Sequence, residues 1–238
     1  MTTITFEPQR LADRAVIALQ GDGALALLHN LLTCDVAQLG QGQAAYGALL
    51  SPQGKILHDV FVFNAGEQIL LDCALEQRES LLQKLKMYKL RAKIEIAARD
   101  DLEIGVGDEG FVDPRHAGMG KRGFINSPLP PVGRVRVGVA PTSSYDEVRI
   151  TLGLADSVAD IGSNVLFPHE ANFDQFGGIS FIKGCYVGQE VVSRMQHRGT
   201  ARSRILPVAG EGLIKGTPIT SAEKSIGEVL STAGQIAL

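Results

Sequence analysis

Three apolar runs joined by short connections constrain the fold of this chain more than any other feature. Residues 44–50 and 56–64 are rich in aliphatic and aromatic side chains, and the turn-forming sequence Ser51-Pro52-Gln53-Gly54 separates them. Residues 68–73 form a third run of the same kind. Because strands joined by such short turns pair side by side in opposite directions, the pattern predicts an antiparallel sheet.

Helices and further strands are expected around this sheet. Leucines recur at spacings of three and four over 24–32, where Asp22 is the expected N-cap, and again over 76–88. A third, short helix is expected over 146–152, and strands are expected at 15–19, 92–98 and 133–139. The sequence therefore predicts an α+β fold with antiparallel sheets and packed helices.

One glycine pattern is a weak motif. Residues 105–110 match G-x-G-x-x-G, but the dinucleotide fingerprint needs a helix directly afterwards, and Phe111-Val112-Asp113-Pro114 follows instead. We therefore expect a loop at 105–110. Residues 113–131 are rich in Pro and Gly, which predicts a long surface loop.

Composition excludes several classes of protein. The net charge of −3 gives no reason to expect nucleic acid as a partner, and no apolar run approaches the roughly 18 residues of a membrane span. Residues 1–7 do not read as a secretory leader, so we expect a cytoplasmic protein, and a monomer. Cys34, Cys73 and Cys185 lie far apart and without ligand spacing, so a structural metal is not expected.

The stretch from 183 to 190 concentrates chemistry in eight residues: Lys183-Gly184-Cys185-Tyr186-Val187-Gly188-Gln189-Glu190. It follows a strand-like run at 178–182 and precedes 191–195, which continues as a helix or as extended chain. A thiolate is a nucleophile and a metal ligand, and both a nearby cation and a helix N-terminus stabilise it. The alternative is that Cys185 is a small buried hydrophobe beside a solvated Lys183 and a tight turn.

This octet resembles the signature of the YgfZ-type folate-binding proteins, which belong to the superfamily of the glycine-cleavage T-protein, an aminomethyltransferase. Seven of its eight positions match the pattern Lys-Gly-Cys-Tyr-x-Gly-Gln-Glu. Other stretches agree with the resemblance, which spans nearly the whole chain: 30–36, 54–59, 88–91, 167–170 and 198–199.

The resemblance implies a tetrahydrofolate-binding accessory protein that supports iron–sulfur cluster assembly or repair. Cys185 would be the working thiol, and the partners would be folate and iron–sulfur proteins or their assembly factors. The alternatives are a folate-dependent aminomethyltransferase, which leaves open whether the protein is an enzyme, and a binding module without chemistry at Cys185.

Site residues follow from the same resemblance. Catalytic roles fall to Cys185, Lys183 and Asp59. T-proteins carry an Asp-Asp pair where this chain has His58-Asp59, so one carboxylate is missing and the aminomethyl chemistry is in doubt. Phenylalanines are expected to wall the pterin, namely Phe173, Phe176 or Phe181. Contacts to the cofactor are assigned to Glu170, Tyr186, Gly188, Gln189, Glu190, Arg149 and Arg194.

Lysines of the second helix offer a further option. Lys84, Lys86 and Lys89 either form a solvated helix face or meet the glutamate tail of a polyglutamylated folate.

The C-terminal residues change to short β-like pieces with frequent glycines. The pieces at 205–208, 218–219 and 226–230 are expected to belong to a small β-barrel, and the chain stops at 238 within a strand-like run. We therefore expect a folate-binding region over 1–197 and an incomplete C-terminal β-barrel module over 198–238.

Overall fold

A five-stranded antiparallel sheet forms the centre of the protein. The computed structural model describes residues 8–125, 144–199 and 201–238. The strand order is β3-β4-β5-β2-β6. The predicted strands at 44–50 and 56–64 are confirmed with the same bounds, and the strands are β2 (Arg14–Gln20), β3 (Ala44–Leu50), β4 (Ile56–Asn64), β5 (Ile69–Ala74) and β6 (Glu95–Ala98).

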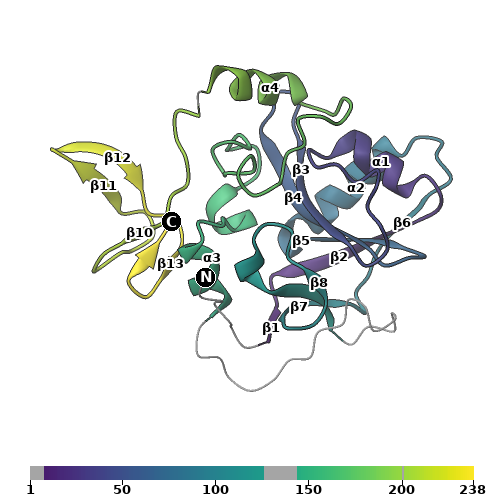
Figure 1. Cartoon of the computed structure of the whole chain (residues 1–238), viewed down its shortest axis with the longest axis horizontal. Helices are drawn as coiled ribbons and strands as arrows, with labels where there is room; N and C mark the ends of the chain where they lie inside the picture. Colours follow the sequence, from purple (N-terminus) through teal and green to yellow (C-terminus); the bar gives the residue numbers. More distant parts are fainter. Residues whose placement is uncertain (1–7, 126–143, 200) are drawn as a thin grey trace.

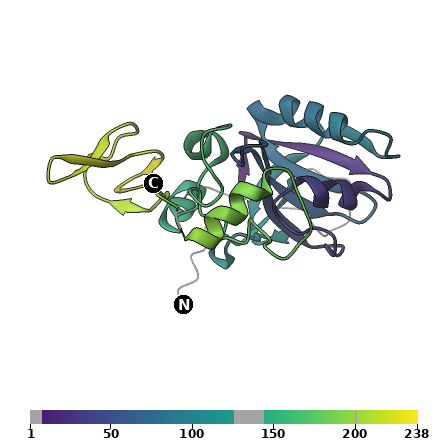
Figure 2. The same cartoon turned by 90° about the horizontal axis from the view of Figure 1, so that it is seen from above.

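Two helices cover one face of this sheet (Figures 1 and 2). Helix α1 (Ala24–Leu31) buries Leu28, and helix α2 (Arg78–Tyr88) follows the short 3-10 turn η1 (Leu75–Gln77). Their apolar sides pack with Val60 and Val62 of β4. Both predicted helices are confirmed, but the residue before α1 is Gly23 and no side chain caps this helix, so the prediction of Asp22 as N-cap is wrong.

A second antiparallel sheet packs on the opposite face. Its order is β1-β7-β9-β8, and Phe63 of β4 meets Phe111 and Phe124 with ring centroids 4.9 and 5.3 Å apart. The elements are β1 (Gln9–Leu11), β7 (Glu103–Gly107), β8 (Phe111–Val112), the 3-10 turn η2 (Ala117–Met119) and β9 (Lys121–Ile125).

Two predicted loops are therefore corrected. Residues 105–107 lie in β7, and 113–125 include η2 and β9. Glycines do not interrupt this sheet, and Gly105 of β7 pairs with Gly123 of β9 in the ladder. The predicted strand at 133–139 and residues 126–131 lie outside the described residues.

The chain from 145 to 199 crosses the second face of the central sheet. Helix α3 (Tyr145–Thr151) begins with a capping box between Ser144 and Glu147, and the π-helical turn η3 (Ser157–Ile161) follows. Helix α4 (Gln189–Arg198) comes after a long irregular segment. The predicted strand at 178–182 is wrong, because all five of these described residues lie in bends and irregular chain.

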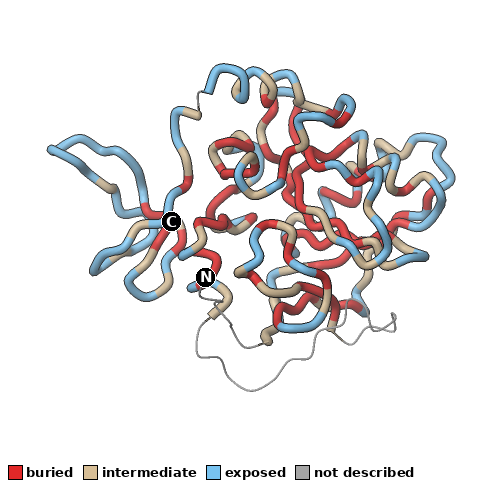
Figure 3. The backbone as a smooth tube through the Cα atoms, in the orientation of Figure 1, coloured by how far each residue is buried: buried red, intermediate tan, exposed pale blue. Residues whose placement is uncertain are grey.

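The C-terminal residues form two small antiparallel sheets at one end of the molecule (Figures 1 and 2). One sheet has the order β10-β14-β13, and the other is the hairpin β11–β12, which Figure 3 shows to be largely exposed. The strands are β10 (Val208–Ala209), β11 (Pro218–Ser221), β12 (Lys224–Glu228), β13 (Thr232–Ala233) and β14 (Ile236–Ala237). Among the described residues, no helix is long and apolar enough to cross a membrane.

Candidate functional site

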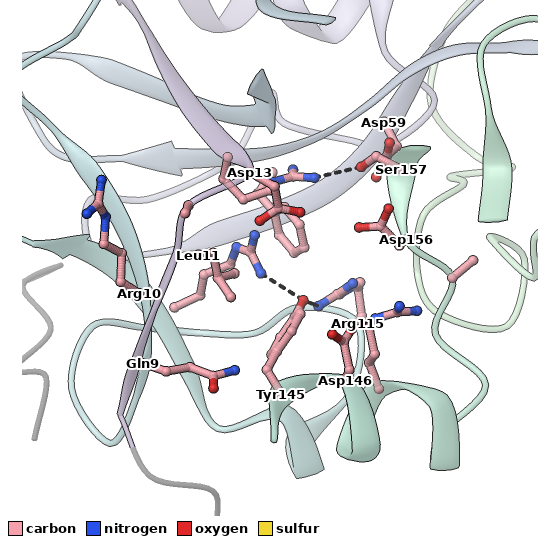
Figure 4. Close-up of a pocket in the computed structure, with 16 residues that line it drawn as sticks. Gln9, Arg10, Leu11, Asp13, Asp59, Arg115, Tyr145, Asp146, Asp156 and Ser157 are labelled. Atoms are coloured by element: carbon pink, nitrogen blue, oxygen red, sulfur yellow. Dashed lines mark hydrogen bonds and ion pairs between the residues drawn. The ribbon is translucent and has the colours of Figure 1, made fainter. Parts of the chain in front are cut away.

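A cavity of about 310 Å³ lies on the side of the central sheet that faces away from α1 and α2. Its walls come from β1, β2, β4, β9, α3, the start of η3 and the segment before η2 (Figure 4). Side chains from segments more than 140 residues apart therefore meet here, and charged groups dominate the lining. The charged residues include Arg14, Asp59, Arg115, Arg122 and Arg149, and Phe61 lies among them.

Asp72 holds two of the arginines beneath the cavity. Its carboxylate accepts from Nε of Arg14 at 2.6 Å and from Nε of Arg122 at 2.5 Å, and its side chain is fully buried. Burial alone would raise the pKa of Asp72, but Arg122 and Arg14 together hold that pKa below its ordinary value. The carboxylate therefore stays ionised and fixes both guanidinium groups.

Aromatic rings hold the arginines of the cavity wall in place. The guanidinium carbons of Arg122 and Arg115 lie 4.2 and 4.6 Å from the centroid of Phe61. The hydroxyl of Tyr145 accepts from both arginines, at 3.0 and 2.9 Å (Figure 4). Arg115 also forms a buried pair with Asp113 at 2.8 Å. Stacking on an aromatic face and pairing with a carboxylate make these arginines part of a rigid wall.

Arg149 joins the cavity to the C-terminal module. Its guanidinium donates to Asp160 at 2.8 Å, to Ser231 at 3.1 Å and to Asp146 at 2.5 Å. Burial alone would lower its pKa, but Asp160 and then Asp146 hold the pKa above its ordinary value. Arg149, which the sequence analysis assigned to the cofactor, lines the cavity. All three of its guanidinium nitrogens, however, already donate to protein groups.

Asp59 has one carboxylate oxygen to spare. The Asp59 side chain lines the cavity although the residue is only 4% exposed. Its Oδ2 accepts from the Tyr46 hydroxyl at 3.1 Å, while its buried Oδ1 accepts from no group in the described part of the chain. An unpartnered buried acceptor in a cavity wall is what a bound molecule with an N–H or O–H donor would satisfy.

The neighbouring His58 points to the other face of β4. Its ring lies 3.3 Å from Oε1 of Gln77 and 3.5 Å from the hydroxyl of Ser80, on the side covered by α2. Since adjacent strand residues face opposite sides, a carboxylate at position 58 would not reach the cavity either. The missing carboxylate therefore does not deprive this cavity of an acceptor.

The octet forms an anchored loop elsewhere on the molecule. The buried ammonium of Lys183 donates to the carbonyls of Leu32 at 2.6 Å, Cys34 at 2.9 Å and His29, which closes the C-terminal end of α1. Burial lowers the pKa of this ammonium. Tyr186 is buried in the core, and burial raises its pKa to about 12. Between these two anchors, Cys185 is exposed.

The other octet residues also have structural contacts. Gly188 has φ of 81° and precedes Gln189, the first residue of α4. A Cβ at Gly188 would lie 2.6 Å from the carbonyl oxygen of Ser51, so the turn between β3 and β4 packs directly against it. Glu190 pairs with Arg194 at 2.5 Å on the exposed side of α4.

The remaining predicted carboxylate, Glu170, bonds within its own region. It accepts from the backbone N–H of Phe167 at 2.9 Å and from the hydroxyl of Ser203 at 2.8 Å. Of the predicted site residues, only Asp59 and Arg149 line the cavity.

Several predicted residues lie away from this cavity. Neither Cys185 nor Lys183 lines it, and the Lys183 amine turns to α1. The aromatic residues that line it are Phe61 and Tyr145, and the predicted Phe173, Phe176 and Phe181 are not among its lining residues. The lysines of α2 lie across the central sheet, so they cannot meet the tail of a ligand in this cavity.

Sequence reasoning missed the cluster of arginines. Arg14, Arg115 and Arg122 come from distant segments, and no local motif joins them. One signal was present: Asp72 interrupts an otherwise apolar strand. A charge in a buried run requires a partner of opposite charge, so Asp72 predicts buried cations nearby.

Comparisons with known proteins identify relatives of this chain by sequence. The chain is 31% identical to "Iron-sulfur cluster assembly factor IBA57 homolog, mitochondrial" of Pyricularia oryzae, over 96% of this chain and 69% of the relative. It is 33% identical to the protein of the same name from Coccidioides immitis, over 84% of this chain but only 56% of that relative. Residues 202–238 match the family described as "CAF17, C-terminal beta-barrel domain".

A solved structure gives the fold class. The glycine cleavage system aminomethyltransferase T from Bartonella henselae superposes with a TM-score of 0.71, over 99% of this chain and 78% of that one, at 16% identity. This similarity confirms the predicted α+β fold of the T-protein type with a C-terminal β module. The prediction of a cytoplasmic location is wrong, because both named relatives are mitochondrial proteins.

Proposed function

Because this chain belongs to the family of the IBA57 iron–sulfur cluster assembly factors, we propose that it supports iron–sulfur cluster assembly with Cys185 as its working thiol and tetrahydrofolate as its ligand. The chain spans 69% and 56% of the two relatives named above, and the role stated in their names supports this proposal. The partners would be iron–sulfur proteins or the machinery that assembles them.

The exposure of Cys185 is the observation that supports its role as the working thiol. Burial raises the pKa of both Cys34 and Cys73 to about 12, so neither forms a thiolate readily. Cys185 is exposed, and Phe181 and Ile182, four and three positions earlier in the chain, are exposed as well, at 42% and 96%. A reachable sulfur next to apolar side chains, on a loop held by Lys183 and Tyr186, suits contact with a protein partner.

The cavity supports the folate part of the proposal. Its volume of about 310 Å³ lies at the lower end of the range for small-molecule sites, which suits the pterin end of the ligand. Asp59 offers an unpartnered acceptor for an N–H donor of the pterin, and Phe61 and Tyr145 line the same cavity, so the residues present fit this group. The resemblance of the octet to the YgfZ-type proteins supports the same ligand. When bound, tetrahydrofolate would supply a carrier of one-carbon groups.

We further propose two structural units, residues 1–197 and 198–238. The family match at 202–238 falls within the second unit, and the Arg149–Ser231 contact links it to the cavity wall.

Replacing the thiol tests the function. In cells that lack the protein, Cys185→Ala should fail to restore iron–sulfur enzyme activity, whereas Cys73→Ala should restore it if it accumulates to the wild-type level. Full rescue by Cys185→Ala would remove the thiol from the proposal.

The aminomethyltransferase alternative has its own test. Tetrahydrofolate is titrated by calorimetry, and methylamine transfer from a lipoylated carrier is then assayed. Binding without turnover is expected; turnover that disappears in Asp59→Asn would favour the enzyme.

A further inference from the structure

The C-terminal end of α2 and the turn after it form a cluster of positive charge that the proposed function does not use. Residues 84–93, here called the α2 tip, contain no carboxylate, although the whole chain carries a net charge of −3. Within the part of the chain that the structure describes, none of the cations of the tip forms an ion pair. These cations are Lys84, Lys86, Lys89, Arg91 and Lys93.

Hydrogen bonds hold the α2 tip in one shape. The N–H of Ala92 donates to the carbonyl of Lys89 at 2.8 Å, and the N–H of Ile94 donates to the carbonyl of Ala92 at 2.9 Å. The Lys89 amine donates to the carbonyl of Ile94 at 2.6 Å, and the Ile94 side chain is buried. The end of α2 and the start of β6 lie at the end of the molecule opposite the C-terminal module (Figure 1). The tip is therefore both ordered and accessible.

Two apolar side chains protrude from the centre of this positive charge. Met87 is 59% exposed and Leu90 is 84% exposed. Leu81 and Leu85 are buried against the central sheet, so Met87 lies on the opposite side of α2. Leu90 has a φ of 48°, in the left-handed region that a leucine rarely adopts. The tip thus presents apolar surface at a cost in hydration and in backbone strain, which contact with an apolar phase would offset in part.

The composition of the tip favours a lipid surface over a protein surface. The buried centres of protein interfaces are depleted in lysine, whereas three of the cations here are lysines. Clusters of roughly four to eight Lys or Arg on an amphipathic helix bind anionic headgroups, and apolar side chains beside them enter the boundary of the acyl chains.

We propose that the α2 tip binds the surface of an anionic lipid bilayer. Met87 and Leu90 enter the interface, while Lys86, Arg91 and Lys93 contact the phosphates of the headgroups. The candidate cavity lies on the other side of the central sheet, so this contact leaves it open to a ligand. The inference is independent of folate binding and of the role of Cys185.

Vesicle flotation tests this proposal on the full chain. The vesicles contain phosphatidylcholine alone, or phosphatidylcholine and phosphatidylglycerol in equal parts, and the bound fraction of protein is measured against lipid concentration. Wild type should bind only the anionic vesicles. Raising the ionic strength from about 0.1 to about 1 M should release it, because the Debye length falls from about 10 to about 3 Å.

Two variants separate the charge from the apolar contact. Lys86→Glu combined with Arg91→Glu should lower the partition coefficient roughly 25-fold or more, since each cation near the surface contributes about fivefold. Leu90→Asn keeps the charge and should lower the coefficient about 10-fold. Because Asn tolerates the left-handed region better than Leu, thermal unfolding should show no loss of stability in Leu90→Asn. The control combines Lys224→Glu with Arg202→Glu, the same charge change on exposed residues of the C-terminal module, and should bind nearly as wild type does.

Three results would overturn the proposal. They are a wild type that does not bind the anionic vesicles, equal binding to the two kinds of vesicle, and a charge variant at the tip that binds no more weakly than the control. A wild type that binds a poly-glutamate peptide but not the anionic vesicles would also overturn it and would assign the α2 tip to an acidic protein.

Discussion

Replacing Asp72 by Asn removes the one carboxylate that holds Arg14 and Arg122 together beneath the cavity. The Nε atoms of Arg14 and Arg122 lie 2.6 and 2.5 Å from the carboxylate oxygens of Asp72, and this carboxylate is completely buried. Breaking a buried ion pair from one side costs about 3–5 kcal/mol, because an uncompensated charge remains in the interior. Two guanidinium groups lose their partner here, so we predict that Asp72→Asn lowers the free energy of unfolding by at least about 3 kcal/mol.

The pH dependence gives the same prediction a second readout. The pKa of Asp72 is lowered in the folded state. The stability that the ionised carboxylate contributes is therefore present above the pKa of the unfolded chain, about 4, and is lost as pH falls through the folded pKa. Wild type should therefore lose more stability between pH 6 and pH 3 than Asp72→Asn does.

Urea unfolding at both pH values measures these effects. Asp101→Asn is the matched control, because Asp101 forms an exposed pair with Arg99 at 2.7 Å, and such pairs contribute about 1 kcal/mol or less. A loss below about 1 kcal/mol in Asp72→Asn, or a pH dependence equal to that of wild type, would show that Asp72 does not hold the two arginines as an ionised carboxylate.

Three further changes probe the anchored loop and the covered face of the sheet. Lys183→Met leaves three buried carbonyls without their donor and should lower the urea midpoint by the equivalent of about 2–3 kcal/mol; an unchanged midpoint would contradict the assigned contacts. Gly188→Ala places a Cβ 2.6 Å from the Ser51 carbonyl at a φ of 81° and should cost about 1–3 kcal/mol in the same assay, and a neutral result would speak against this close approach. Burial lowers the pKa of His58 in the folded protein. The contribution of the neutral imidazole to stability is therefore complete above about pH 6.5 and is lost as pH falls through the folded pKa. Stability measured from pH 7.5 to 5 should fall in wild type and fall less in His58→Gln.

Local patterns explain which parts of the fold the sequence predicts. The strands at 44–50 and 56–64 were predicted with the correct bounds because each is a continuous apolar run ended by turn residues. β9 was missed because Lys121, Arg122 and Gly123 do not look like a strand, and only pairing with the distant β7 makes them one. Arg122 is tolerated there because Asp72 neutralises it.

The candidate site likewise has parts that a local pattern predicts and parts that depend on the fold. The octet is recognisable from the sequence because its polar groups are concentrated in one stretch. The sequence does not reveal that the Lys183 ammonium bonds to carbonyls at the end of α1, away from the exposed Cys185. Asp59 was named from a resemblance, while its partner Tyr46 lies 13 positions away on the adjacent strand β3. Cross-strand contacts of this kind depend on register, and the irregularity between Leu49 and Leu50 shifts the register of β3 against β4, which the turn sequence alone does not reveal.

Alkylation of the native protein tests the central claim most directly. The folded chain is treated briefly with iodoacetamide at neutral pH, and the modified residues are identified by mass spectrometry, with urea-unfolded protein as the reference in which all three cysteines react. We expect modification at Cys185, with Cys34 and Cys73 unmodified. Labelling of Cys34 or Cys73 before Cys185, or a Cys185 that reacts only after unfolding, would contradict it.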